Sequence, residues 1–167
     1  ADRVKDVQSR KQVLVVGAGG RERALALKLL ESPHVSSVTL LGGRGDPYGR
    51  HDLHVAEDAD PVAHARQGAY DLAVVGPEGP LAAGVADDLR GAGIPTVGPG
   101  SDGARLETSK AFAKDVMRQA GIPTGSYAAF TSASEAAAYL RERDWPRGVV
   151  VKADGLAAGK GVVVCDT

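Results

Sequence analysis

The sequence is poor in cysteine and in aromatic residues, and it has no long apolar run. Cys165 is the only cysteine among 167 residues, so no internal disulfide can form and a reducing compartment is the simpler expectation. No apolar stretch reaches the length of a membrane span, which argues against membrane insertion. Aromatic residues make up only 4% of the chain, which predicts a core built from valine, leucine and alanine.

Neither sign of charge dominates the composition. Lysine and arginine total 20 against 21 for aspartate and glutamate, which gives a net charge of −1. Nucleic-acid binding usually needs clustered positive charge, so we expect no nucleic-acid partner. The polar residues at the start of the chain lack the apolar segment of a signal peptide. The expected location is the cytoplasm, or an organelle matrix if a targeting segment preceded Ala1.

Short apolar runs alternate with helical stretches over the first hundred residues. This alternation predicts right-handed βαβ units and a parallel sheet, in which ligands bind at the carboxyl ends of the strands. The expected strands are Val13–Val16, Val38–Leu41, Leu53–Val55, Leu72–Val75 and Pro95–Val97, and the expected helices are Arg21–Glu31, Pro61–Gln67 and Leu81–Arg90.

The pattern changes after about residue 108, where a different structural unit is expected. Ser132 and Glu135 have the spacing of a capping box at the start of one helix. The expected helices here are Ser109–Ala120 and Ser132–Arg143, and the expected strands are Tyr127–Phe130, Val149–Val151 and Val162–Val164. The fold class is therefore α/β, a parallel sheet followed by a second unit.

The glycine-rich loop between the last two strands is the most informative feature. Glycines at 155, 159 and 161 allow backbone amides to approach an anion, and Lys160 and Lys152 add positive charge. This combination is typical of a nucleotide triphosphate site. It is not a P-loop, because three residues separate Gly155 from Gly159 and because Gly161 follows Lys160. The alternative is a β-hairpin with a flexible glycine turn and no ligand.

A second glycine-rich segment, Gly17–Arg21, follows an expected strand and begins an expected helix. Glu22 stands where a dinucleotide fingerprint has its third glycine, and the acidic residue expected near Leu40 is absent, which argues against a nicotinamide or flavin cofactor. The segment predicts a backbone anion site at a helix N-terminus, with Arg21 as an added cation. A tight turn with nothing bound is the alternative.

Glu78 and a set of histidines and carboxylates near residue 55 are either ligand-binding residues or solvated surface residues. Glu78 follows a buried strand between two prolines, and it is either a carboxylate directed at a ligand or a solvated loop residue. His51, His54, Glu57, Asp58 and Asp60 are irregularly spaced, so a solvated edge explains them better than a metal site.

Four blocks, in this order, resemble the glycinamide ribonucleotide synthetase (phosphoribosylamine–glycine ligase) family of the ATP-grasp superfamily. They are VLVVGAGGRERALALKL, VVGPEGPLAAG, GARLETSKAFAKDVMRQAGIPT and VVVKADGLAAGKGVVV. The resemblance implies a flexible extension over residues 1–11, a Rossmann-like pre-ATP-grasp domain over residues 12–108, and the beginning of an ATP-grasp domain over residues 109–167.

The resemblance also implies a reaction and its ligands. ATP phosphorylates the carboxylate of glycine, and the amine of 5-phosphoribosylamine attacks the resulting glycyl phosphate, a step of purine biosynthesis. The residues that match ATP phosphate binding are Lys110, Lys152, Gly155, Gly159, Lys160 and Gly161. Those that match phosphoribosylamine binding are Gly17, Gly19, Gly20, Arg21 and Glu78. The cofactors implied are ATP and Mg²⁺, with the metal ligands expected outside this chain.

The chain departs from the family pattern in three ways. Arg23 replaces a histidine, the segment Leu41–Gly45 replaces an Ala-Pro-Gly-Asn loop, and family members extend well beyond Thr167. One hypothesis is therefore an N-terminal portion of a ligase, inactive alone and completed by a companion polypeptide. The other is a non-catalytic module that serves as a structural subunit of a larger assembly.

Overall fold

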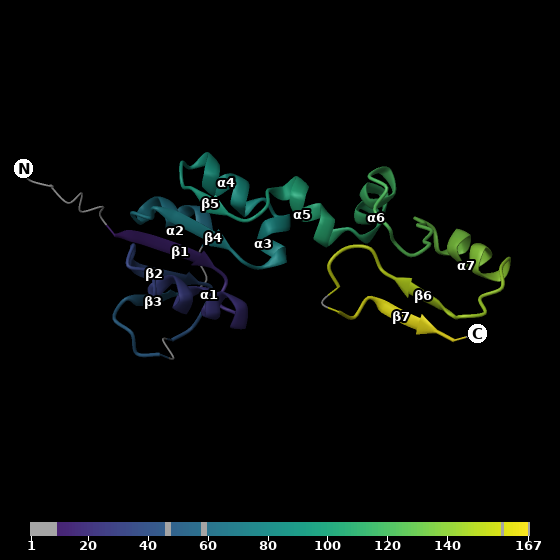
Figure 1. Ribbon diagram of the computed structural model, residues 1–167, viewed down its shortest axis with the longest axis horizontal. Helices are drawn as coiled ribbons and strands as arrows, with labels where there is room; N and C mark the ends of the chain where they lie inside the picture. The colour runs from purple at the N-terminus through teal and green to yellow at the C-terminus, as the bar shows by residue number, and fades with distance from the viewer. Residues whose placement is uncertain (1–9, 46–47, 58–59, 158, 167) are drawn as a thin grey trace, which may run out of the picture. The chain divides into compact units, whose positions relative to one another are not determined.

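The computed structural model describes residues 10–45, 48–57, 60–157 and 159–166. The chain divides into two compact units between Ala104 and Arg105 (Figure 1). Most of the expected N-terminal extension, residues 1–9, lies outside the described residues, whereas Lys11 already belongs to the first strand. Within the described ranges, no helix has both the length and the apolar character needed to span a membrane.

The first unit is a five-stranded parallel sheet, as the alternating pattern predicts. The strands lie in the order β3-β2-β1-β4-β5, and each neighbouring pair is parallel. The strands are β1 (Lys11–Val16), β2 (Val35–Leu41), β3 (Leu53–Ala56), β4 (Leu72–Val75) and β5 (Thr96–Val97). The helices are α1 (Gly20–Leu30), α2 (Pro61–Gln67), α3 (Glu78–Ala82) and α4 (Val85–Gly91), and α5 (Ser101–Thr108) spans the boundary between the units.

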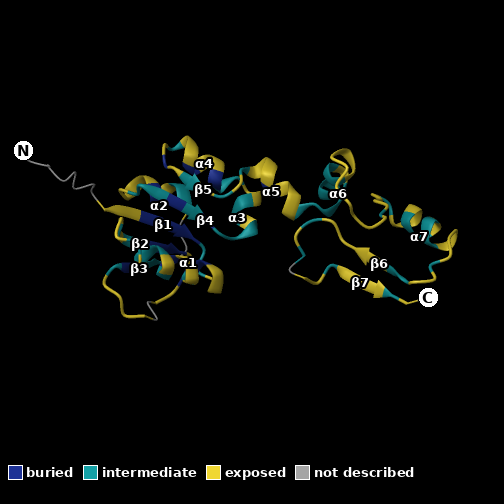
Figure 2. Ribbon diagram, viewed as in Figure 1, coloured by how far each residue is buried: buried dark blue, intermediate teal, exposed yellow. Residues whose placement is uncertain are grey.

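Alternate residues of β1 contribute to two separate hydrophobic clusters, because successive side chains of a strand point to opposite faces of its sheet. Leu14 and Val16 pack in the cluster that includes Ala65 of α2 and Leu89 of α4. Val13 and Val15 pack in the cluster that includes Ala26 of α1. The continuous buried run in β1 follows from this two-sided covering (Figure 2).

The second unit has a different organisation. It contains α6 (Lys110–Gln119), α7 (Ala133–Arg141), and the antiparallel strands β6 (Val149–Lys152) and β7 (Val162–Cys165). The two strands match those expected on either side of the glycine loop, and Ser132 caps α7 as expected, since its hydroxyl oxygen accepts a hydrogen bond from the Glu135 amide. None of the described residues of this unit is buried (Figure 2).

The expected single helix Leu81–Arg90 is wrong, because two helices occupy this segment. The chain ends α3 at Ala82 and begins α4 at Val85. Between them Gly84 has a φ of +85°, in the left-handed region that glycine adopts at little cost. The glycine therefore interrupts an apolar pattern that would otherwise read as one helix.

The expected strand Tyr127–Phe130 is also wrong, since the structure contains no strand there. Its side chains are held by helices: the Tyr127 hydroxyl donates to Asp115 at 2.9 Å, and the Phe130 ring lies 5.0 Å from the Tyr139 ring. Within the described residues, β6 and β7 form a two-stranded sheet and pair only with each other. A residue pattern typical of strands does not form a strand without a partner to accept its backbone hydrogen bonds.

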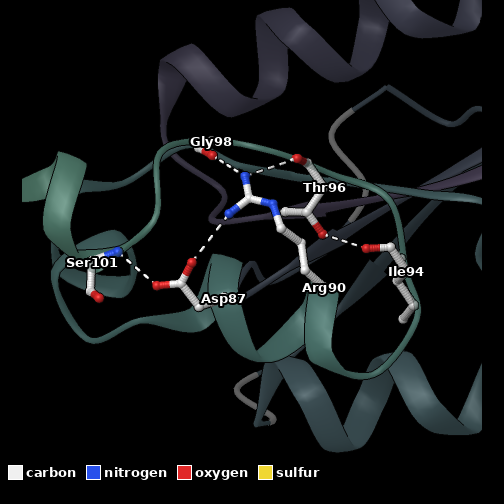
Figure 3. A network of polar contacts seen from close by, with 6 residues as sticks. All are labelled: Asp87, Arg90, Ile94, Thr96, Gly98 and Ser101. Carbon is white, nitrogen blue, oxygen red and sulfur yellow. Dashed lines mark hydrogen bonds and ion pairs between the residues drawn. The ribbon is translucent and has the colours of Figure 1, made fainter.

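Helix α5 was not expected, and its N-terminus depends on Asp87, which lies 14 residues earlier in the sequence. The Asp87 carboxylate accepts a hydrogen bond from the Ser101 amide at 2.7 Å and pairs with Arg90 at 3.3 Å (Figure 3). The Arg90 guanidinium in turn donates to the carbonyl oxygens of Thr96 and Gly98. This network joins α4 to the segment between β5 and α5.

Replacing Asp87 by asparagine is expected to lower the melting temperature in a pH-dependent way. The hydrogen bonds from Ser101, chiefly its backbone amide, hold the pKa of Asp87 below its ordinary value of 3.8. A depressed pKa adds stability above the unfolded-state pKa, and this stability is lost as the pH falls through the lower folded-state value. Thermal melts of both proteins should therefore differ at neutral pH and converge below pH 3.8. A difference that persists in acid would contradict this role of the charge.

Candidate functional site

The first candidate site lies where β1 and β4 end. The chain leaves β1 toward β2 on one side of the sheet and later returns as β4 on the other side, and such a reversal opens a crevice at the carboxyl ends of the strands. Gly17 follows β1 and donates its amide to Leu41 at 2.8 Å, while Gly76 follows β4 and donates to Val16 at 3.3 Å. We call residues 17–22 together with Glu78 the glycine-turn cluster.

Gly17 has to be glycine for two reasons. Its φ of +101° lies in the region that other residues rarely adopt. A Cβ at this position would also lie only 2.6 Å from Cγ of Pro77. The turn after β1 therefore packs directly against the segment that follows β4.

Glu22 is a buried residue of this cluster that the sequence pattern does not reveal. In the sequence it is only a mismatch to the dinucleotide fingerprint, yet its side chain is 4% exposed and lies under the turn. Its carboxylate accepts hydrogen bonds from the Gly19 amide at 3.1 Å and from Nε of Arg21 at 2.9 Å. A Cβ on Gly76 would collide with the same carboxylate. The available signal was its place three residues after Gly19, the spacing of a capping glutamate.

Glu22 changes the interpretation of the expected anion site. The Gly19 amide is used by a carboxylate of the same helix, so it is not left for a ligand. At Gly20, by contrast, a Cβ would meet open space. An anion at this helix N-terminus would therefore be bound by the amides that follow Gly19 and by Arg21.

Arg21 and Glu78 lie beside each other, with 3.7 Å between Nη1 and Oε1. Both side chains are about half exposed, so the pair adds little stability but directs both groups to the same place. Glu78 begins α3 and does not lie in an irregular turn. The structure thus brings together all the residues for which the family resemblance implies phosphoribosylamine binding: Gly17, Gly19, Gly20, Arg21 and Glu78.

The two departures from the family pattern in this region are neighbours in space. Nε of Arg23 donates to the Ala18 carbonyl at 3.0 Å, and a Cβ on Gly43 would lie 2.7 Å from Cβ of Ala18. Nη1 of Arg23 is buried and has no hydrogen-bond partner in the described part of the chain. Arg23 and the altered loop around Gly43 therefore both lie against Ala18 of the glycine turn.

The second candidate site lies in the second unit, at the end of β6. We call Lys110, Lys152 and the described residues between Asp154 and Gly161 the glycine-loop cluster. Nζ of Lys110 donates to the Gly155 carbonyl at 2.9 Å, across 45 residues of sequence. Lys152 ends β6, and both it and Lys160 are exposed. Three cationic side chains and a glycine-rich backbone thus belong to one short hairpin and the helix beside it.

The backbone of the loop accounts for its glycines. Gly155 and Gly159 have φ values of +88° and +76°, which favour glycine. A Cβ on Gly161 would lie 2.7 Å from Cβ of Ala157, and the Gly161 carbonyl accepts the Ala153 amide at 2.7 Å. The loop therefore has a defined path at its base.

Asp154 connects the loop to the start of α6. Its carboxylate accepts hydrogen bonds from the Ala111 amide at 3.2 Å and from the Ser109 hydroxyl at 3.0 Å. These interactions, the Ala111 amide foremost, lower the pKa of Asp154 below its ordinary value of 3.8. The residue is ionised at neutral pH and lies two residues after Lys152 in the sequence.

The described residues contain no cluster of metal-ligand side chains. Across residues 10–45, 48–57, 60–157 and 159–166, no three histidine, cysteine, aspartate or glutamate side chains lie close enough to hold a metal ion. Asp58, from the irregular histidine and carboxylate group of the sequence, lies outside these ranges, and His54 is part of β3.

Comparison with protein families gives two adjoining matches. Residues 11–107 match the model described as phosphoribosylglycinamide synthetase, N domain. Residues 108–167 match the model described as phosphoribosylglycinamide synthetase, ATP-grasp (A) domain. Together the two models cover the chain from β1 onward.

Curated relatives point the same way. The chain is 49% identical over 156 residues to phosphoribosylamine–glycine ligase of Rhizobium meliloti. The aligned region covers 92% of this chain and 36% of that protein. It is 45% identical over 161 residues to the ligase of Vibrio cholerae, which covers 93% and 37% respectively. The chain therefore spans less than two-fifths of the length of these relatives.

Solved structures show a shared fold at low sequence identity. An ADP complex of N5-carboxyaminoimidazole ribonucleotide synthetase aligns with 96% of this chain and 42% of its own, with a TM-score of 0.74 and 18% identity. The biotin carboxylase domain of 2-oxoglutarate carboxylase from Hydrogenobacter thermophilus aligns with 95% and 38%, with a TM-score of 0.72 and 22% identity.

Proposed function

Because the chain belongs to the phosphoribosylglycinamide synthetase family, we propose that it is the N-terminal portion of an ATP-dependent ligase joining glycine to 5-phosphoribosylamine. The proposal is supported chiefly by one observation. Each of the two units contains one cluster of glycine and cationic residues suited to an anionic reagent. Two phosphate-bearing reagents are what this reaction requires, and catalysis by placing two reagents needs no side-chain nucleophile.

The glycine-loop cluster is proposed to hold the phosphates of ATP. The residues are Lys110, Lys152, Gly155, Gly159, Lys160 and Gly161. The ammonium groups supply positive charge to phosphate oxygens, and the glycine backbone allows close approach. Bound ATP supplies the phosphoryl group that activates the carboxylate of glycine. We expect the magnesium ligands to lie outside this chain and assign the metal no residue here.

The glycine-turn cluster is proposed to hold 5-phosphoribosylamine. The residues assigned to the ligand are Gly17, Gly19, Gly20, Arg21 and Glu78, where Gly19 contributes backbone shape because its amide is bonded to Glu22. Arg21 and the amides at the start of α1 suit the phosphate, while the half-exposed Glu78 carboxylate suits a hydroxyl or amine of the sugar. Arg23 and the segment around Gly43 replace the usual family residues next to this cluster, so sugar-phosphate affinity is the property most open to change.

Completion of the ligase by further polypeptide is supported by the surface of the hairpin. Several valines of β6 and β7 are exposed, with Val163 at 58% and Val164 at 70%. Apolar residues gathered on one small sheet are typical of a surface that another segment covers. We propose that this polypeptide supplies the rest of an ATP-grasp domain. The proposed location of the protein is the cytoplasm or an organelle matrix.

Adding the chain to the remaining portion of the Rhizobium meliloti ligase should restore activity. We expect ADP formation that depends on both glycine and 5-phosphoribosylamine. In this assembly, Lys110→Ala or Lys152→Ala should lower the affinity for ATP by about tenfold, since each removes a charged donor to phosphate. Lys28→Ala is the matched control, because Lys28 is exposed on α1 and pairs with Glu31.

The reconstitution also tests the alternative of a non-catalytic module. The same remaining portion, combined with its own N-terminal portion, provides the positive control. If that pair is active while the assembly containing this chain turns over no substrate, the proposed ligase function is wrong. A structural role would then explain the departures at Arg23 and Gly43.

A further inference from the structure

We propose that Asp154 is a positioning residue of the glycine-loop cluster, which holds the start of the loop against the N-terminus of α6 and so places Lys110 beside Gly155. The inference rests on the nucleotide site proposed above and extends it to a residue with no assigned role. Asp154 does not contact the reacting groups in this view. It acts through Lys110 and Gly155.

The first argument is the concentration of contacts at one point. Two successive residues after β6, Asp154 and Gly155, receive hydrogen bonds from three successive residues at the start of α6. The donors are the Ser109 hydroxyl, the Lys110 ammonium and the Ala111 amide, at 3.0, 2.9 and 3.2 Å. The partners are 43 to 45 residues apart in sequence, so these bonds join two segments that are distant in the chain.

The second argument is electrostatic. A carboxylate two residues from Lys152 would repel phosphate if its charge were directed at the ligand. Instead, both oxygens of Asp154 are bonded to α6, where the partial positive charge of a helix N-terminus stabilises an anion. Asp154 therefore occupies this helix end itself and leaves the lysines and the glycine backbone to bind phosphate.

The third argument concerns Lys110. Its side chain is half-buried, and its ammonium already donates one hydrogen bond, to the Gly155 carbonyl. An ammonium has three donors, so it can keep this bond and still donate to a phosphate oxygen. The position of the Gly155 carbonyl, which Asp154 sets from one residue away, thus determines where that charge lies.

The variant Asp154→Ala is expected to fold, because α6 keeps its own cap. The Phe112 amide donates to the Ser109 hydroxyl oxygen at 3.1 Å, a bond that does not involve Asp154. Asp60→Ala is the matched control. Asp60 is also an aspartate that accepts backbone amides at the start of a helix, those of Val62 and Ala63 at 2.9 and 2.7 Å, but it lies in the first unit.

Two measurements on the full chain test the proposal. The first is the rate at which an acylating reagent modifies Lys110, relative to Lys28, measured by mass spectrometry without nucleotide. Asp154→Ala should raise this ratio about threefold, because the ammonium loses its fixed place beside Gly155. The second is the affinity for magnesium ATP and for tripolyphosphate by calorimetry, which should fall about tenfold. Asp154→Asn keeps one acceptor oxygen and should fall between.

The outcomes separate this inference from the proposed function. Unchanged Lys110 reactivity in Asp154→Ala overturns the positioning role, as does an equal loss of affinity in Asp60→Ala. A wild-type chain that binds neither probe contradicts the proposed nucleotide site and the affinity part of the inference. The Lys110 reactivity then still decides whether Asp154 positions that lysine.

Discussion

Replacing Glu22 by alanine is expected to lower the free energy of unfolding of the first unit by about 3 kcal/mol, because a buried donor loses its charged partner. The Gly19 amide and Nε of Arg21 both donate to this carboxylate, which is nearly inaccessible to solvent. Alanine leaves the amide unpaired beneath the glycine turn. It also removes the side chain against which the backbone of Gly17 and Gly76 packs.

The effect should extend to ligand binding. Glu22 orients Arg21, whose guanidinium also lies beside Glu78, so the glycine-turn cluster loses its internal support. Urea denaturation measures the stability, and calorimetric titration with ribose 5-phosphate measures the site. Glu22→Gln should be intermediate in both, because its amide has one acceptor oxygen where the carboxylate has two.

Glu31→Ala is the control for Glu22, since it removes a glutamate from the end of the same helix. The Glu31 side chain is 65% exposed and pairs with Lys28 at the surface. We expect its unfolding curve and its ribose 5-phosphate titration to match those of the wild type. If Glu22→Ala were as stable as Glu31→Ala, the buried carboxylate would have no structural role.

Replacing Leu14 by alanine is expected to be equally damaging, at about 2–5 kcal/mol of unfolding free energy, through the cavity it leaves. Leu14 is completely buried in the central strand and packs in the cluster that contains Leu89 and Val75. The strands on both sides of β1 restrict how far the backbone can move to fill the space. Urea denaturation followed by circular dichroism measures the change.

Leu25→Ala makes the same chemical change on the surface of the same unit. Leu25 lies on α1 and is 39% exposed. We expect a change of less than about 0.5 kcal/mol, partly because alanine favours a helix. Equal losses for the two variants would mean that the core is not centred on β1.

The parallel sheet could be predicted because its strands carry their own signal. Leu72–Val75 and Pro61–Gln67 match β4 and α2 to the residue, and each is bounded by turn residues or a cap. The break at Gly84 was missed because a glycine within an apolar helical pattern is often tolerated. Helix α5 was missed because Asp87, which lies 14 residues earlier in the sequence, holds its N-terminus.

The candidate site was predictable where glycine and charge adjoin in sequence, and not where the contact is distant. The two glycine-rich segments are recognisable from the sequence alone. In the structure, Gly17 and Gly155 have the positive φ angles that glycine allows. Glu22 read as a mismatch because its burial depends on Gly76, far along the chain. Asp154 carries no such signal, because its hydrogen-bond partners lie 43 to 45 residues away at the start of α6.

The absence of buried residues from the described part of the second unit has a consequence for how the chain opens. Local stability follows the apolar surface that a region buries, so native-state hydrogen exchange should be slowest in β1 and fast in β6 and β7. A ligand that binds only the folded form of such a unit stabilises it. The added stability grows with the logarithm of the ratio of ligand concentration to dissociation constant. Order in the hairpin would then report occupancy: whatever binds it also folds it more firmly, while the sheet around β1 stays closed throughout.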